Sequence, residues 1–326
     1  MNNLHLSAQL LYSLTDAGGR LPWIKKWLIE EVWSRQHYAT LRPLEYLRKG
    51  EDAVKNFESL ISLSADRVYG ELLSLPDQNK GLLNVLSDKQ TAVVVYDGLS
   101  LRELPIILQL AEKSGLTASE IDCSLASAPC DTLEYIKREF NLSKVAPSTL
   151  PSRKELKEKN ITASYTANPT QSAGNGELGK SFLIWSAFPD NTYRDSGAKF
   201  ENHFENIHVQ IETAWINTVQ QIKGKSKIII TSDHGYIFFG TGMEFPRTLS
   251  EMRELNNYFG NDRFAYLSDK PNVPLSDDVY VDESRQVAML KGRVKTRSTG
   301  EASSKLYKHG GLSLMEMLTP WIILEQ

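Results

Sequence analysis

The chain has 326 residues, of which 41% are hydrophobic and 24% are charged, and its formal net charge is −3. This composition is typical of folded globular proteins and excludes an extensively disordered chain, while the length favours about two domains. The small net charge excludes a strong overall attraction to nucleic acid or to an acidic membrane.

The two cysteines, Cys123 and Cys130, lie seven residues apart. This spacing fits neither a disulfide framework nor the CxxC pair of a structural zinc site, so both are expected to be buried, small apolar residues. The sequence contains neither a signal peptide nor an apolar run long enough to span a membrane. We therefore expect a cytoplasmic protein.

Residues 1–88 are expected to form a helical N-terminal region. Leu10, Leu11 and Leu14 recur at the spacing of one helix face, and the stretch LPWIKKWLIEEVW repeats that period. No strand signal of comparable strength occurs there. Nothing in this region suggests chemistry.

The pattern changes at residue 89, and residues 89–326 are expected to form an α/β domain. A short, β-branched run, TAVVVY, is typical of a strand buried on both faces of a parallel sheet. Strand and helix patterns then alternate, which predicts a three-layer sandwich with a central, mostly parallel sheet. The expected strands are 91–96, 121–129, 180–188 and 225–232, and the expected helices are 101–115, 131–140 and 202–222.

Two stretches interrupt this alternation. Residues 146–179 are rich in Pro, Ser, Thr, Asn and Gly and are predicted to form a long loop or lid. Residues 241–308 are predicted to form an inserted β subregion with one hairpin, VYVDESRQVAML, turning near Asp282 to Ser284.

Acidic and imidazole side chains follow several of the expected strands. Asp97, Asp190 and the pair Asp233-His234 each come directly after an apolar run, and His309 precedes the last one. In open α/β sheets, ligands bind beyond the carboxyl ends of the strands, so these side chains are expected to converge. Carboxylates and imidazoles together favour a divalent cation. Taken alone, a single Asp at a strand end is more often a turn former or a helix cap.

The motifs VVVYDGLSLRE, APCDT, FPD, TSDHGYIF and KHGGLSLMEMLTPWI, in this order, resemble the PglZ domain, a branch of the alkaline phosphatase superfamily. The resemblance covers about residues 91–326 and implies an alkaline-phosphatase-like sandwich. It implies two divalent metals, usually Zn²⁺ with Mn²⁺ or Mg²⁺ as alternatives, around a Ser or Thr nucleophile that cleaves phosphate mono- or diesters. PglZ proteins accompany BREX-type phage-defence systems, so it also implies a role in bacterial defence or signalling, with defence-system protein partners.

Carried over by position, the resemblance assigns Asp97, Asp233 and His234 to one metal and Asp190 and His309 to the second. Many relatives outside this branch carry a histidine four residues after the second-site aspartate. This chain has Arg194 there, and either Asp195 or water would have to replace the missing ligand.

Thr132 is the predicted nucleophile. It opens a predicted helix after Pro129-Cys130-Asp131, and a helix N-terminus favours an anionic phosphate. Ser127, at the end of the preceding strand, is the alternative. In either case the resemblance implies an in-line displacement that forms a phosphorylated enzyme.

A basic run precedes His309, in which Lys291, Arg293, Lys295 and Arg297 alternate along the chain, with Lys305 and Lys308 further on. Alternate residues of a strand point the same way, so the run is either a solvated strand face or a surface for a polyanion such as an oligonucleotide. The expected phosphoester substrates include oligonucleotides and cyclic nucleotides.

Two alternatives to a hydrolase remain open from the sequence. The first is a catalytically silent metal-binding module that acts by docking within a defence complex. The second is an unrelated doubly wound protein that binds a nucleotide cofactor. The second is disfavoured because VVVYDGLS has one glycine and lacks the glycine-rich pattern of phosphate-cradling loops.

Overall fold

The structure, a computed structural model, describes residues 19–62, 65–74, 81–177, 179–192, 200–222, 224–240, 242–297 and 307–326. Leu10, Leu11 and Leu14 of the expected first helix lie outside these ranges. The chain forms two compact units. The sheet unit comprises Gln78–Ser127, Asp131–Gly235 and Leu318–Gln326; the second unit comprises Met1–Asp77, Ala128–Cys130 and Tyr236–Met317.

The sheet unit is built on a six-stranded sheet with the order β2-β11-β5-β1-β4-β3. Its strands β5, β1, β4 and β3 run parallel, whereas β11 pairs antiparallel with both β2 and β5. The strands are β1 (Thr91–Tyr96), β2 (Thr117–Leu125), β3 (Ile161–Thr166), β4 (Ser181–Ser186), β5 (Lys227–Thr231) and β11 (Leu318–Glu325).

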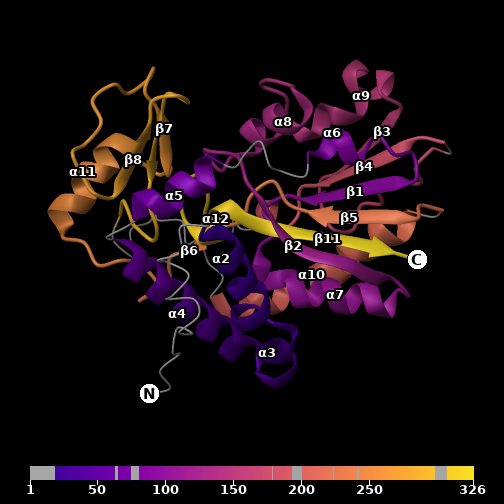
Figure 1. Cartoon of the computed structure of the whole chain (residues 1–326), viewed down its shortest axis with the longest axis horizontal. Helices are drawn as coiled ribbons and strands as arrows, with labels where there is room; N and C mark the ends of the chain where they lie inside the picture. Colours follow the sequence, from indigo (N-terminus) through magenta and orange to yellow (C-terminus); the bar gives the residue numbers. More distant parts are fainter. Residues whose placement is uncertain are drawn as a thin grey trace. The chain divides into compact units, whose positions relative to one another are not determined.

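Helices cover both faces of this sheet, with α6, α8 and α9 on one face and α7 and α10 on the other (Figure 1). Their bounds are α6 (Leu82–Val85), α7 (Leu104–Lys113), α8 (Thr132–Phe140), α9 (Lys154–Glu158) and α10 (Phe200–Asn217), with 3₁₀ turns η4 (Leu101–Glu103), η5 (Pro147–Ser152), η6 (Asp190–Thr192) and η7 (Val219–Gln221). Every residue of β1 is buried, as its continuous apolar run predicts. The predicted α/β sandwich with a mostly parallel central sheet is confirmed.

Two parts of this sheet were not predicted. Residues 146–179 are not a loop throughout, because they contain η5, α9 and the edge strand β3, whose ITASYT sequence is only partly buried. The C-terminal LTPWIILE forms β11, in the interior of the sheet, despite Pro320. Pro320 is tolerated because it pairs only with Cys123 of β2, while the pairing of β11 with β5 begins one residue later.

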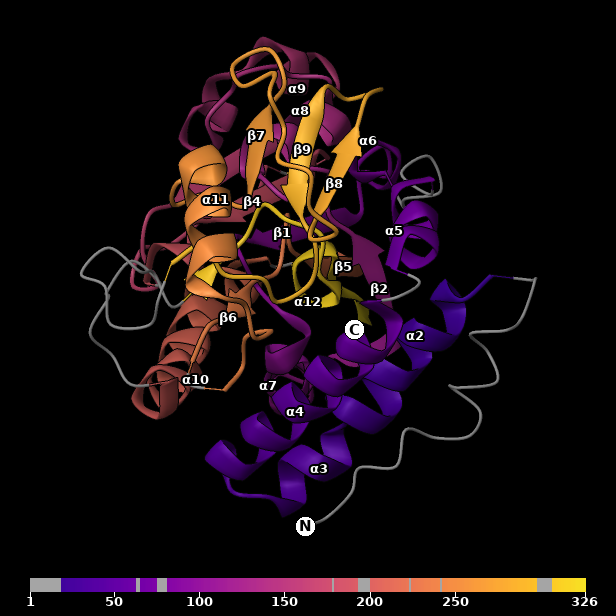
Figure 2. The ribbon, with the colours of Figure 1, turned by 90° about the vertical axis from the view of Figure 1, so that its left-hand side faces the viewer.

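The second unit combines the N-terminal helices with the predicted β subregion. The helices are α2 (Leu21–Trp27), the π-helix η1 (Leu28–Val32), α3 (Arg35–Thr40), α4 (Pro43–Ile61) and α5 (Ala65–Ser74), so the helical N-terminal segment is confirmed for the described residues. Figure 2 shows β7, β9 and β8 side by side with α11 next to them. The remaining elements are β6 (Ile237–Phe238), α11 (Leu249–Phe259), β7 (Phe264–Tyr266), β8 (Val279–Asp282), β9 (Val287–Leu290), β10 (Tyr307–Lys308) and α12 (Leu314–Met317). Strands β8 and β9 form the predicted hairpin.

Buried ion pairs hold the β subregion to the N-terminal helices. Arg293 lies 2.7 Å from Glu51 and 2.9 Å from Glu58, and all three side chains are fully buried. Glu58 also accepts a hydrogen bond from the backbone N–H of Leu314, at 2.8 Å. These contacts join segments of the second unit that lie more than 230 residues apart in sequence.

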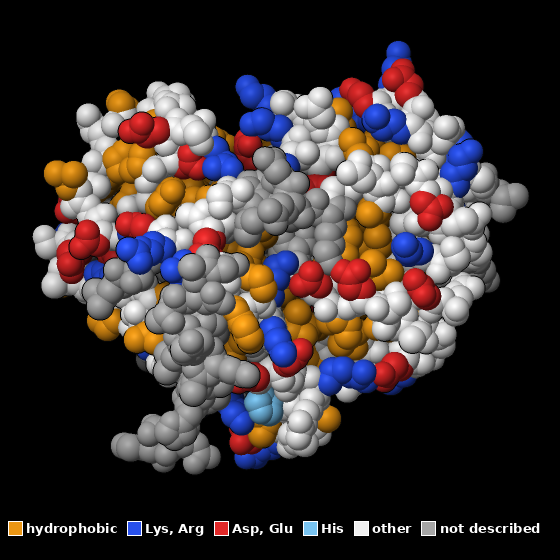
Figure 3. Space-filling view, viewed as in Figure 1, with side chains coloured by type: hydrophobic (Ala, Val, Ile, Leu, Met, Phe, Trp, Pro, Cys, Tyr) orange, Lys and Arg blue, Asp and Glu red, His pale blue; other side chains and the backbone are white. Residues whose placement is uncertain are grey.

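The prediction that the basic run forms a solvated strand face is wrong. Lys291 to Arg297 follow the end of β9 in turns, and Arg293 is fully buried against α4. Lys291 pairs with Asp66, and Lys295 pairs with Glu244. On the face drawn in Figure 3, Lys and Arg side chains lie among Asp and Glu side chains. Lys305 lies outside the described residues.

Candidate metal centre

Three adjacent parallel strands bring the predicted ligands to one edge of the sheet. Val95 of β1 is in register with Thr231 of β5, so Asp97 and Asp233 occupy corresponding positions, each two residues further along. On the other side, Asp190 begins η6 after β4, and its backbone N–H bonds to the carbonyl of Asp97 at 2.9 Å. The expected convergence of strand ends is therefore observed for these residues.

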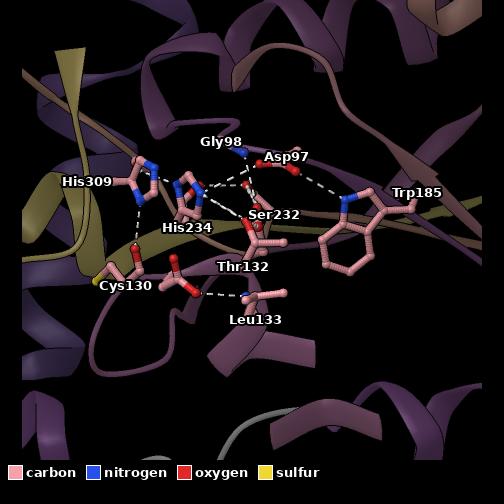
Figure 4. A network of polar contacts seen from close by, with 12 residues as sticks. Asp97, Gly98, Cys130, Thr132, Leu133, Trp185, Ser232, His234 and His309 are labelled. Carbon is pink, nitrogen blue, oxygen red and sulfur yellow. Dashed lines mark hydrogen bonds and ion pairs between the residues drawn. The ribbon is translucent and has the colours of Figure 1, made fainter. Parts of the chain in front are cut away.

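His234, Asp97 and Asp233 form a tight, buried group. The Nε2 atom of His234 lies 3.6 Å from Oδ1 of Asp97 and 3.6 Å from Oδ2 of Asp233. One ligand atom from each of the three residues lies within 4.8 Å of the others. Thr132 joins them from α8, since its hydroxyl donates to Oδ2 of Asp233 at 2.6 Å and lies 3.5 Å from Nε2 of His234 (Figure 4).

Asp233 and His234 each make further hydrogen bonds through their other side-chain polar atom. Oδ1 of Asp233 accepts from the backbone N–H of Gly98 at 3.1 Å and from the Ser232 hydroxyl at 3.4 Å. Nδ1 of His234 lies 2.9 Å from the carbonyl oxygen of Gly235, and this contact fixes Nδ1 as the protonated nitrogen. Consequently Oδ2 of Asp233 and Nε2 of His234 face the group, an arrangement typical of metal ligands with supporting partners.

Gly98 fits this edge for a steric reason. Its φ of +74° lies in the left-handed region, and an added Cβ would lie 3.1 Å from Cβ of Asp190. Asp97-Gly98 is therefore more than a turn signal, because the backbone of Gly98 passes between two of the predicted ligands while its N–H binds a third, Asp233.

The electrostatics of the group favour a bound cation. Burial raises the pKa of Asp97 well above its usual value, and the neighbouring charges of Asp233 and Asp190 raise it further. Burial alone would lower the pKa of His234, but the charges of Asp233, Asp97 and Asp190 outweigh it and raise that pKa to about 9. In the absence of another cation, a proton on His234 balances these carboxylates. A divalent ion would take its place.

One oxygen of the group accepts no hydrogen bond from the described residues, although Nε2 of His234 lies 3.6 Å from it. Oδ1 of Asp97 is buried, and within the described ranges no hydrogen-bond donor reaches it. A buried acceptor without a donor costs about 1–3 kcal/mol, so its presence calls for an explanation. A divalent ion bound to Asp97, Asp233 and His234 would supply the missing contact, and two carboxylates with one imidazole fit Zn²⁺ or Mn²⁺.

The two hydroxyls considered for the nucleophile lie in different surroundings. Thr132 is the first residue of α8, half-buried, with its hydroxyl against the carboxylate and the imidazole. Ser127 instead donates to the backbone carbonyl of Asp131 at 3.2 Å. Asp131 caps α8 as predicted, accepting from the N–H of Leu133.

The other predicted residues are Asp190, described above, His309, Arg194 and Asp195. His309 belongs to the second unit, where its Nδ1 lies 2.8 Å from the backbone oxygen of Cys130. Arg194 and Asp195 lie outside the described residues. The roles of Asp190 and His309 in a second metal site stay predictions. Both cysteines are buried and unbridged, as expected.

Trp185 and Ser232 are the polar contacts that the sequence did not reveal. Ser232 stands within the TSDHG motif and could have been singled out. Trp185 gave no signal, because a tryptophan in an apolar strand is most simply a core residue.

The fold and site define an α/β protein whose central sheet ends in a carboxylate, imidazole and hydroxyl cluster. No known protein family matches the chain, and no curated protein matches it in sequence. Solved structures resemble it loosely. Murine ectonucleotide pyrophosphatase/phosphodiesterase 5, in complex with AMP, is 13% identical over 72% of this chain and 88% of its own, with a TM-score of 0.43. Phosphonoacetate hydrolase from Sinorhizobium meliloti 1021, in complex with phosphonoacetate, is 13% identical over 71% and 89%, with a TM-score of 0.37.

These scores describe a loose likeness in chain path, and no role of any residue follows from them. Within the described ranges, no helix combines the length and the apolarity needed to cross a bilayer.

Proposed function

We propose that this chain is a metal-dependent phosphoester hydrolase, a phosphodiesterase or phosphatase, with Thr132 as its nucleophile. Asp97, Asp233 and His234 hold the first divalent cation. The observation that carries the proposal is the placement of the Thr132 hydroxyl, 2.6 Å from Oδ2 of Asp233, in a group whose remaining acceptor, Oδ1 of Asp97, has no donor among the described residues.

The chain's own residues explain how such a reaction proceeds. A bound cation would lower the pKa of the Thr132 hydroxyl and attract the phosphoester oxygens. Asp233 accepts the hydrogen bond of that hydroxyl and so holds Oγ1 toward the group. Attack of Oγ1 on phosphorus passes the hydroxyl proton to Asp233, forms a phosphothreonine and breaks the bond to the leaving oxygen, which leaves as the protonated alcohol. Water then hydrolyses the phosphothreonine, which releases the phosphate product and restores the threonine. The N-terminal end of α8, where Thr132 lies, favours the anionic phosphate throughout.

Zn²⁺ is the proposed metal, with Mn²⁺ or Mg²⁺ as alternatives. In the full proposal, Asp190 and His309 serve a second cation. The assignment to the PglZ type, the role in BREX-type phage defence or signalling, and the defence-system partners are supported by the sequence resemblance alone. Oligonucleotides and cyclic nucleotides stay within the proposed substrate class. A basic strand face is not part of this support, because Arg293 is buried in ion pairs.

A silent metal-binding module is the second candidate, favoured by the absence of a histidine at position 194. Metal content and turnover separate the two. The purified chain is expected to retain Zn²⁺ or Mn²⁺ and to hydrolyse bis-para-nitrophenyl phosphate or para-nitrophenyl phosphate. Bound metal without turnover would support the silent module. A chain that shows no bound metal and no turnover would refute both candidates.

Three variants test the roles of individual residues. Thr132→Val replaces the hydroxyl with a methyl group of similar size and is expected to lower turnover by about a thousandfold or more while metal content stays unchanged. His234→Ala is expected to abolish metal at the first site together with turnover. Ser127→Ala is the matched control and should keep parental turnover. If Ser127→Ala loses activity and Thr132→Val keeps it, Ser127 is the nucleophile.

A further inference from the structure

Trp185 touches the candidate metal centre from inside the core. It lies on β4, is fully buried, and is in register with Val95 of β1. Its indole Nε1 donates to Oδ2 of Asp97 at 3.3 Å, and Figure 4 shows the ring on the side of Asp97 away from His234. An indole nitrogen donates and does not accept, so Trp185 cannot itself bind a cation.

The contact determines which oxygen of Asp97 is available. The terminal torsion of an aspartate is broad, so an unrestrained carboxylate can present either oxygen. With Oδ2 tied to the indole, Oδ1 is the atom that lies 3.6 Å from Nε2 of His234 and has no donor among the described residues. The hydrogen bond from the indole thus orients the Asp97 carboxylate so that Oδ1 faces the other proposed ligands.

The indole ring is itself held by the helix that carries Thr132. Tyr135, three residues after Thr132 in α8, packs edge-on against Trp185 with ring centroids 6.1 Å apart and planes at 70°. Both aromatic rings are fully buried in the same hydrophobic core. Trp185 therefore has little room to turn, and its N–H stays directed at Asp97.

We infer that Trp185 is a positioning residue, which pre-orients Asp97 so that Oδ1 receives the divalent cation. This inference rests on the proposed function, because it takes Asp97 as a metal ligand. It assigns a role to a residue that would otherwise only fill the core. Supporting partners of metal ligands are typically worth about 10- to 100-fold in metal affinity.

The test compares two tryptophans that undergo the same chemical change. Trp185→Phe removes the indole N–H beside Asp97. Trp215→Phe is the matched control: Trp215 is equally buried, and its Nε1 donates to the Ser114 hydroxyl at 2.9 Å, linking α10 to the end of α7 on the other face of the sheet. The Zn²⁺ or Mn²⁺ affinity of the metal-free chains is measured by chelator competition, alongside their thermal unfolding.

Trp185→Phe is expected to weaken metal binding about tenfold or more, whereas Trp215→Phe should stay within about twofold of the parent. Equal affinities in all three proteins, or equal losses in both variants, would overturn the inference. If Trp185→Phe does not fold, β-(3-benzothienyl)alanine at position 185 keeps the ring size and replaces only the N–H, and the same result is expected. A parent chain that binds neither metal would instead overturn the proposed function, and the inference with it.

Discussion

Arg293→Met should destabilise the second unit strongly. The guanidinium of Arg293 lies 2.7 Å from Glu51 and 2.9 Å from Glu58, and all three side chains are fully buried. Methionine fills similar space but leaves two carboxylates in the interior without their cation. Breaking a buried ion pair from one side costs about 3–5 kcal/mol. At roughly 2–4 °C per kcal/mol, the melting temperature should fall by about 10 °C.

Lys291→Met is the matched control. Lys291 pairs with Asp66 at 3.0 Å, but the Asp66 side chain is 74% exposed, so the loss should stay below about 1 kcal/mol. Urea unfolding of the parent and both variants measures the difference. A loss below about 1 kcal/mol for Arg293→Met would refute the reasoning.

The deficit of Arg293→Met should also depend on pH. Burial raises the pKa of Glu58, and in the parent the charge of Arg293 lowers it again. Without Arg293 that pKa rises further above its unfolded value, so the folded state takes up a proton more readily than the unfolded state. The variant should therefore recover stability relative to the parent as the pH falls from 7.5 toward 5. An unchanged deficit would contradict this assignment.

Three further predictions use other residues. Gly98→Ala should weaken metal binding, because the added Cβ meets Asp190, and should destabilise the fold by more than the roughly 1–2 kcal/mol of strain that a left-handed backbone costs an alanine. Gly115→Ala is the control: Gly115 has a φ of +75° and open space around it, so this variant should cost only the backbone strain. Since the pKa of His234 is raised to about 9, chelator competition should show metal affinity rising about tenfold per pH unit from pH 6 to 8 and levelling off around pH 9, and a flat profile would contradict this. Burial lowers the pKa of His208 to about 4. The free energy of unfolding should therefore fall by about 2 kcal/mol between pH 6.5 and pH 5, because the unfolded chain binds a proton at this histidine and the folded chain does not. His208→Gln should remove this pH dependence of stability, and an equal pH dependence in the variant would disprove the assignment.

The sequence predicted the parts of the fold that follow local patterns. Continuous apolar runs identified β1, β4 and β5, and Asp97 and Asp233 were placed at one sheet edge because parallel strands end together. Strand β3 was missed because edge strands are only half-buried and so lack a continuous apolar run. Helix α11 carries a local signal for a helix start, the capping box of Thr248 and Glu251.

Long-range ion pairs cannot be predicted from local patterns. Arg293 stands in an alternating basic run typical of a solvated strand, yet its partners Glu51 and Glu58 lie more than 230 residues earlier on a helix. Neither glutamate differs locally from the surface acids around it. The same limit applies to Trp185, whose role depends on the register between β4 and β1. Pairings of this kind depend on the tertiary structure.

The two proposed metal sites should lose their cations in different variants. Asp97, Asp233, His234 and their supporting contacts from Gly98 and Trp185 all belong to the sheet unit, so the first cation needs no ligand from elsewhere.

His309, by contrast, belongs to the second unit and is assigned only to the second cation. His309→Ala should therefore lower the metal content from two equivalents to one, whereas Asp97→Asn should remove the first cation. Elemental analysis of the purified variants measures this. Loss of all metal from His309→Ala, or no loss, would refute the division of ligands between the sites, because the carboxylate and imidazole group is complete without His309.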